Sequence, residues 1–170
     1  MFPHPEKYHW EIILRITQMQ IKKINKDDLA VYLPQIISIE RQVQDHPWSE
    51  KIFLDSVGDN YRFYVLMEDD TVLGYAVYDY VLDESTLQNI SVAAENQGSG
   101  LGRHLLLESM RMLKDELGIV RMMLEVRISN IKAINLYKSV GFAQDMIRKN
   151  YYPMSDGSRE HGLLMSMCLD

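Results

Sequence analysis

The sequence lacks the features that mark a secreted or membrane-bound protein. Its single cysteine, Cys168, cannot form an internal disulfide, which indicates a reducing compartment and disfavours a structural zinc site. The amino terminus lacks the basic start, apolar stretch and cleavage site of a signal peptide, and no apolar run approaches the length that crosses a bilayer. We therefore expect a cytoplasmic protein with no membrane partner and no bound metal.

Basic residues are also scarce. The chain has 24 acidic and 18 basic side chains and a formal net charge of −6. Nucleic-acid binding generally requires a basic surface that neutralises phosphates, so this balance argues against a direct nucleic-acid partner. An acidic protein is better suited to a cationic substrate.

The length of 170 residues fits one domain, which buries about two-thirds of its unfolded surface without cross-links. Residues 1–17 show no clear element and are treated as an N-terminal extension of unknown role. Within this extension, Trp10 and residues 12–14 would alter substrate choice if they covered the substrate groove. Residues 18–170 are expected to form a single domain without internal repeats.

The spacing of apolar residues predicts, in order, a strand, two helices, three strands, a helix, a strand, a helix and two strands. Asn25, Ser49 and Asn130 are the expected helix caps, and Gly118 is an expected helix end. Gly74 is a candidate β-bulge. The expected ranges are about 19–23, 26–41, 49–53, 63–67, 72–81, 86–92, 101–117, 122–126, 130–141, 142–151 and 162–169. This order indicates an α/β (α+β) fold, a mixed, mostly antiparallel sheet with helices on both faces.

A glycine-rich segment, Gln97–Arg103 (QGSGLGR), lies between a predicted strand and the longest predicted helix. Glycines let the backbone turn sharply, so successive N–H groups and the positive end of the helix dipole can meet an anion. Each charge-assisted hydrogen bond contributes roughly 1.5–3 kcal/mol, so a few of them hold a pyrophosphate without a metal.

Other interpretations of this loop fit less well. A Walker loop requires Lys and then Ser or Thr after its last glycine, where this chain has Arg103 and His104. A dinucleotide fingerprint requires a third glycine at Arg103, although Glu125 imitates the acid that binds ribose. A connection without a ligand is the remaining alternative.

Gln97, Gly100 and Gly102 resemble the Gln/Arg-x-x-Gly-x-Gly/Ala motif of the GCN5-related N-acetyltransferases (GNAT). Further segments resemble one branch, the bacterial RimI family, which acetylates the N-terminal alanine of a small-subunit ribosomal protein. The resemblance covers about Met19 to Met167. The matching segments are His46–Lys51 (HPWSEK), Val81–Glu84 (VLDE), Asn89–Val92 (NISV), Leu124–Arg127 (LEVR), Ser129 with Asn130, Leu136 with Tyr137, Gly141 with Phe142, and Arg148–Pro153 (RKNYYP).

The resemblance implies the GNAT fold for residues 18–170 and acetyl-CoA as co-substrate. It also implies a protein N-terminus as acceptor, on a ribosomal protein. The backbone of Ile90, Ser91 and Val92 is expected to bind pantetheine like an added strand, and Asn130 to contact the cofactor. The residues expected to hold the pyrophosphate are Gly98, Ser99, Gly100, Leu101, Gly102 and Arg103.

Acetyl transfer to an amine requires a base for the amine and an acid for the departing thiolate. The resemblance makes Glu125 the proton acceptor, directly or through water, and Tyr137 the proton donor. The residues alone permit these roles, because Glu125 lies opposite Leu124 on its strand and a phenol is protonated at neutral pH. They equally permit a solvated carboxylate and a tyrosine that packs on the apolar stripe of its helix.

The acceptor groove has several candidates. Aromatic side chains with polar tips suit a partly wet cleft, and Asp83 and Glu84 could attract a basic peptide. The alternatives are a core position for the tryptophan, a turn position for the histidine and solvated charges for the two acids. The groove candidates other than the acids are His46, Trp48, Tyr151 and Tyr152.

Two other functions remain open at this point. The same fold could acetylate a small amine, such as a polyamine or an antibiotic. It could also be an acyl-CoA-binding module without catalysis, although neither Glu125 nor Tyr137 is missing.

Overall fold

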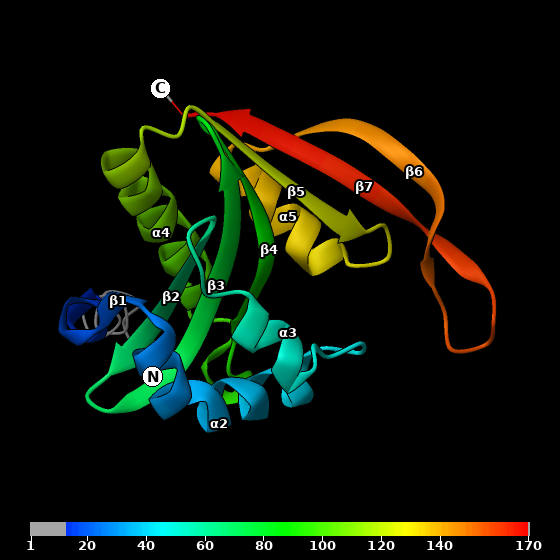
Figure 1. Cartoon of the computed structure of the whole chain (residues 1–170). Coiled ribbons are helices and arrows are strands. Elements are labelled where there is room, and N and C mark those ends of the chain that lie inside the picture. Colours follow the sequence, from blue (N-terminus) through cyan, green and yellow to red (C-terminus); the bar gives the residue numbers. More distant parts are fainter. Residues whose placement is uncertain (1–12, 170) are drawn as a thin grey trace, which may run out of the picture.

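The structure is a computed structural model that describes residues 13–169 (Figure 1). Its elements follow the predicted order. They are β1 (Gln20–Ile24), α2 (Lys26–Val43), α3 (Glu50–Asp55), β2 (Tyr61–Glu68), β3 (Thr71–Val81), β4 (Glu84–Val92), a 3-10 turn (Ala94–Asn96), α4 (Leu101–Leu117), β5 (Arg121–Arg127), α5 (Ile131–Val140), β6 (Ala143–Pro153) and β7 (Arg159–Cys168). No helix within residues 13–169 is long and apolar enough to cross a membrane.

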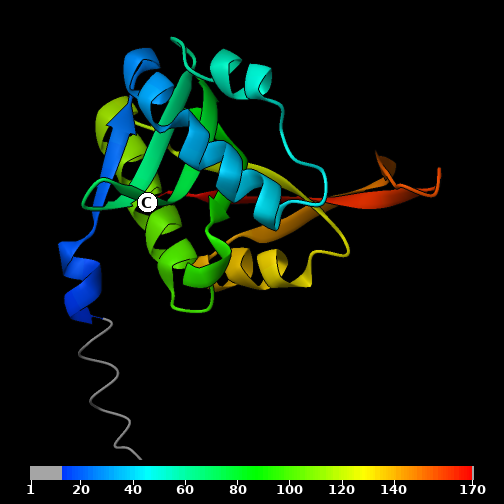
Figure 2. The ribbon, with the colours of Figure 1, turned by 90° about the horizontal axis from the view of Figure 1, so that it is seen from below.

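The predicted strands form one seven-stranded sheet in the order β1-β2-β3-β4-β5-β7-β6. Neighbouring strands are antiparallel except β4 and β5, which are parallel. The prediction of a mixed, mostly antiparallel sheet is therefore confirmed. β6 and β7 form an arm that projects beyond the helices (Figure 2).

Helices cover both faces of the sheet, as predicted (Figure 2). The central strands are apolar at successive positions, so alternate side chains enter opposite cores. Tyr64 and Leu66 of β2 belong to the core under α4 and α5, whereas Phe63 and Val65 belong to the core under α2 and α3.

Local caps fix the ends of α2, α4 and α5. Asn25 caps α2 with a capping box, in which Asn25 Oδ1 accepts from Asp28 N–H at 2.9 Å. α4 begins after Gly100 and ends at Gly118, and both glycines adopt left-handed backbone angles. Asn130 caps α5, where its Oδ1 accepts from Ala133 N–H at 3.2 Å. These caps act within a few residues, which explains why the sequence predicts them.

β4 and β5 pair over only part of their length. The parallel ladder joins Glu84–Leu87 to Arg121–Leu124 and then stops. Gln88 is an extra residue in the β3–β4 register, and such a bulge bends its strand. Beyond this point β4 stays paired with β3 and β5 with β7, so the two strands diverge (Figure 1).

The bulge expected at Gly74 is present in β3, with Leu73 as the extra residue beside it. A Cβ on Gly74 would lie 2.8 Å from the carbonyl oxygen of Ser91 in β4, so glycine is required for this close approach.

The N-terminal extension differs from the prediction where it is described. Residues 13–18 are helical, and Arg15 bonds Glu68 through two nitrogens at 3.1 Å each. This contact depends on a residue of β2, which a local pattern does not reveal. Trp10 and Ile12 lie outside the described residues, and residues 13–18 line no part of the cleft described below.

Candidate active site

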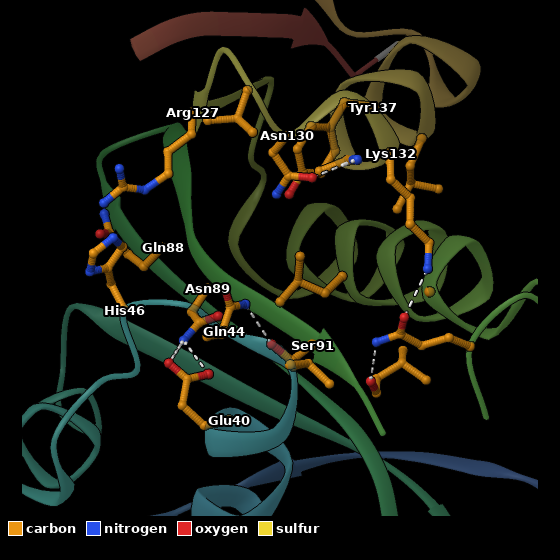
Figure 3. Close-up of a pocket in the computed structure, with 18 of the residues that line it drawn as sticks. Glu40, Gln44, His46, Gln88, Asn89, Ser91, Arg127, Asn130, Lys132 and Tyr137 are labelled. Atoms are coloured by element: carbon orange, nitrogen blue, oxygen red, sulfur yellow. Dashed lines mark hydrogen bonds between the residues drawn. The ribbon is translucent and has the colours of Figure 1, made fainter. Parts of the chain in front are cut away.

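A cleft of about 480 Å³ opens where β4 and β5 diverge (Figure 3). One wall consists of the end of α2, the loop 44–48 and β4. The other consists of β5 and α5, and the glycine loop lies at one end. The parting of two sheet strands therefore creates the cavity, and both walls contain residues predicted from the sequence.

The glycine loop has the backbone geometry expected of an anion site. Gly98 and Gly100 have φ angles of 76° and 82°, which an L side chain rarely adopts. No side chain within residues 13–169 caps the N-terminus of α4, so its first N–H groups are available to an anion. The loop residues that line the cleft are Gln97, Gly98, Gly100, Gly102 and Arg103.

Two predicted loop residues face elsewhere. Leu101 is 3% exposed and packs in the core, and the hydroxyl of Ser99 donates to the carbonyl of Asn96 at 2.7 Å. Neither residue lines the cleft. A contact with an anion there would have to come from their backbone N–H groups.

Gln97 connects the loop to its surroundings. Its Nε2 donates to the Val92 carbonyl at 3.0 Å, and its Oε1 accepts from Lys132 Nζ at 2.8 Å (Figure 3). Lys132 thus brings a cation to a loop that has no lysine of its own. Lys132 was not predicted from the sequence, in which its position two residues after Asn130 was the only available signal.

One edge of β4 is open along Ile90, Ser91 and Val92. These residues pair with β3 on one side, and the ladder to β5 has already ended at Leu87 and Leu124. The three residues line the cleft, and β5 does not pair with them. An open strand edge of this kind can bind an extended ligand through main-chain hydrogen bonds.

Glu125 and Tyr137 both line the cleft. The side chain of Glu125 is 28% exposed and pairs with Arg148 of β6 at 2.9 Å. It is therefore neither buried nor an ordinary solvated surface charge. The sequence predicted no role for Arg148 beyond its place in a matching segment.

The sequence left open whether Tyr137 packs in the core or faces the site, and the structure shows both features. Its ring is 7% exposed and packs edge-on against Phe142, with 5.9 Å between ring centroids. Its hydroxyl has no hydrogen-bond partner within residues 13–169 and is not sealed from solvent, so it faces the cleft. Burial raises the pKa of Tyr137 above its ordinary value, which keeps the phenol protonated at neutral pH.

Three of the groove candidates line the cleft, namely His46, Trp48 and Tyr152. Burial, followed by the charge of Glu125, raises the pKa of Tyr152 to about 12. The guanidinium of Arg127 lies 4.6 Å from the centre of the Tyr152 ring and also pairs with Glu160 at 2.7 Å. These contacts hold Tyr152 at the wall of the cleft.

The other groove candidates lie elsewhere. Tyr151 does not line the cleft and instead stacks under Arg148, 4.7 Å from the ring centre. Asp83 and Glu84 lie at the far end of β4, outside the cleft lining, and Glu84 pairs with Arg121 at 3.4 Å. Neither acid therefore lines the groove, because β4 carries its charged end away from the divergence.

Glu40 was also not predicted from the sequence. Its side chain is 1% exposed, yet it borders the cleft from the last turns of α2. The only sequence signal was an acid beside the apolar residue Ile39 near the end of a predicted helix. Within residues 13–169 no cluster of three or more potential metal ligands is present.

The chain matches the family model described as Acetyltransferase (GNAT) family over residues 28–142. It is 43% identical over 135 residues to the [Ribosomal protein bS18]-alanine N-acetyltransferase of Escherichia coli (strain K12), covering 79% of this chain and 90% of that protein. It is 31% identical to the putative enzyme of the same description from Bacillus subtilis (strain 168), covering 80% of this chain and 88% of that protein. The crystal structure of the Escherichia coli ribosomal-protein-S18-alanine N-acetyltransferase superposes with a TM-score of 0.80 and 38% identity, covering 89% of this chain and 94% of that one.

Proposed function

Because the chain belongs to the GNAT family of acetyltransferases, we propose that it transfers the acetyl group of acetyl-CoA to the N-terminal α-amine of a protein. We propose that the acceptor is a ribosomal protein with an N-terminal alanine, because the names of the chain's relatives give that acceptor for the relatives. The observation that carries the proposal is the cleft between β4 and β5, which joins an anion-binding loop to Glu125 and Tyr137. The cytoplasm is the proposed compartment, on the argument from Cys168.

The cofactor is proposed to enter along the open edge of β4. The pyrophosphate would bind the backbone of Gly98–Arg103 and the first N–H groups of α4, which no side chain within residues 13–169 caps. The pantetheine would bond the main chain of Ile90–Val92. Asn130 lines the same region and has donors left after its cap contact through Oδ1.

The chemistry assigned to the site is direct transfer. The neutral α-amine attacks the thioester carbonyl, a C–N bond forms, and the C–S bond then breaks. Glu125 takes the proton that the amine loses, directly or through water, and Tyr137 gives a proton to the departing thiolate. An α-amine has a pKa of about 7.7–8.0, so about a tenth is neutral at pH 7 and only a modest base is required.

The deciding experiment measures the release of free CoA from acetyl-CoA. The purified protein is mixed with a short peptide that begins with alanine, or with the same peptide blocked at its N-terminus and retaining a lysine. We expect turnover only with the free α-amine. Turnover with the blocked peptide would indicate lysine acetylation, and no turnover with either peptide despite acetyl-CoA binding would indicate a small-amine acceptor or a binding module.

A further inference from the structure

Glu40 is a buried charge for which the reaction proposed above has no use. It lies on the last turns of α2 and is 1% exposed. The C-terminal end of a helix carries the negative end of the helix dipole, so this position disfavours an anion. A buried acid at the C-terminal end of a helix, beside a substrate cleft, therefore requires an explanation.

The contacts of Glu40 indicate an ionised carboxylate. Oε1 accepts from the backbone N–H of Trp48 at 2.8 Å, and Asn89 Nδ2 donates to both oxygens at 3.2 Å. The hydroxyl of Tyr75 donates to Oε2. Burial and the Glu40 charge raise the pKa of Tyr75, so the phenol keeps its proton and remains a donor. Every partner is a donor, as an ionised carboxylate requires.

This anion has no cation. Within residues 13–169, no lysine, arginine or histidine lies within ion-pair distance of Glu40, although other acids around the cleft are paired, Glu125 with Arg148 and Glu160 with Arg127. Burying an ion is costly unless an opposite charge compensates it, and neutral donors compensate it only in part. The missing cation would therefore be supplied from outside the chain.

The geometry limits where such a cation can enter. Glu40 borders the cleft from the end of α2, and Asn89 lies between its carboxylate and the open space (Figure 3). Asn89 uses its amide nitrogen on Glu40, and its Oδ1 has no hydrogen-bond partner within residues 13–169. An amide oxygen held in this way can accept a hydrogen bond from an ammonium group.

We propose that Glu40 is the positioning residue that selects a protonated amine as acceptor. It holds Asn89 and the loop 44–48 in place, and its charge attracts the α-ammonium group of the incoming peptide before Glu125 removes the proton. This inference rests on the proposed function, because it concerns the acceptor of that reaction. A purely structural role would instead tie α2 to β4 with no preference for a charged ligand.

Two peptides separate these roles. The first begins with a free alanine amine and the second is the same peptide already acetylated, which lacks the positive charge. Their dissociation constants are measured on the CoA-bound full chain for the wild type, for Glu40→Gln and for Asp45→Asn. Glu40→Gln has nearly the same shape, and its amide oxygen can still accept from Trp48 N–H while its amide nitrogen donates to the Tyr75 hydroxyl. Asp45→Asn removes an equal charge from an exposed position of the neighbouring loop.

We expect Glu40→Gln to weaken binding of the free-amine peptide on the order of ten-fold, the size of a charge interaction through partly polar protein. Binding of the acetylated peptide should change less than about two-fold, and Asp45→Asn should change neither peptide more than that, because exposed charges are screened. Equal losses for both peptides, or no loss for either, would overturn the inference.

The wild type provides a second test that does not depend on the variant folding. Between pH 7 and 9 the α-amine loses its charge, with a pKa of about 7.7–8.0, so binding of the free-amine peptide should weaken as pH rises. The acetylated peptide reports any contribution from His46 or other groups of the cleft and should stay nearly constant. Equal pH dependence for both peptides would overturn this inference alone, whereas a wild type that binds neither peptide would overturn the proposed acceptor as well.

Discussion

Tyr137→Phe removes one oxygen atom from the lining of the cleft and little else. The ring is 7% exposed and packs against Phe142, and phenylalanine keeps that packing. The hydroxyl has no hydrogen-bond partner within the described part of the chain, so its removal breaks no internal bond. We therefore expect the free energy of unfolding to change by less than about 0.5 kcal/mol.

The effect on catalysis should be far larger. If Tyr137 gives its proton to the thiolate, its loss should lower kcat about 10²–10⁴-fold, which corresponds to a barrier about 3–5 kcal/mol higher. Because burial raises the pKa of Tyr137, the wild-type phenol stays protonated across the usual assay range. The loss should therefore be independent of pH between about 7 and 9.

The assay combines three measurements on the same preparation of Tyr137→Phe. Release of free CoA with the alanine peptide gives kcat, a binding titration gives the affinity for acetyl-CoA, and a thermal melt gives stability. We expect the first to fall while the other two stay near wild type. A kcat within about three-fold of wild type would refute proton donation and leave Tyr137 as a packing residue.

Three further outcomes follow from the geometry. Glu125→Gln should lower kcat about 10²–10⁴-fold at neutral pH and leave the acetyl-CoA affinity unchanged. Activity that recovers at high pH, where the amine is already neutral, would support a base role for Glu125, whereas an unchanged kcat at neutral pH would contradict it. Gly100→Ala should cost about 1–2 kcal/mol in acetyl-CoA affinity or stability, because the φ of Gly100 is 82° and open space surrounds it. Gly58 is also in open space but has no left-handed φ, so Gly58→Ala should cost almost nothing. Equal effects of the two substitutions in titrations and melts would argue against a conformational cause. Burial raises the pKa of several tyrosines, so the folded state holds protons that the unfolded chain releases near pH 10. Their contribution to the free energy of unfolding should be fully present below about pH 10 and should fall as pH rises above it. A free energy of unfolding in urea that stays constant to pH 11 would contradict this. These tyrosines are Tyr64, Tyr75 and Tyr78.

The sequence predicts the elements well because their signals are local. Asn25 and Asn130 cap helices through contacts three residues away, and Gly118 ends α4 in a left-handed conformation. The glycine loop belongs to the same class, since its backbone angles at Gly98 and Gly100 are a property of glycine itself. The structure of the described part of the N-terminal extension was harder to predict, because the contact of Arg15 with Glu68 spans 53 residues.

The site was predictable only in part for a related reason. A strand pattern places Glu125 on one face, but it does not say where the neighbouring strand ends. It therefore left open whether Asp83 and Glu84 lie near the groove, and neither residue lines it. For Tyr137 the sequence offered packing or catalysis as alternatives. The structure shows a packed ring and a hydroxyl that faces the cleft, because the α5 stripe borders both.

The sequence by itself determined the order of helices and strands, the caps, the glycine loop and the family to which these motifs belong. Only the tertiary structure decided that β4 and β5 part after Leu87, which turns two predicted strands into the walls of a cleft. It also decided that Glu40 meets Asn89, 49 residues away, and that Lys132 reaches Gln97, 35 residues away. Caps and turns depend on neighbours along the chain, whereas these contacts depend on how the sheet is ordered and where its strands diverge, and no local spacing encodes that.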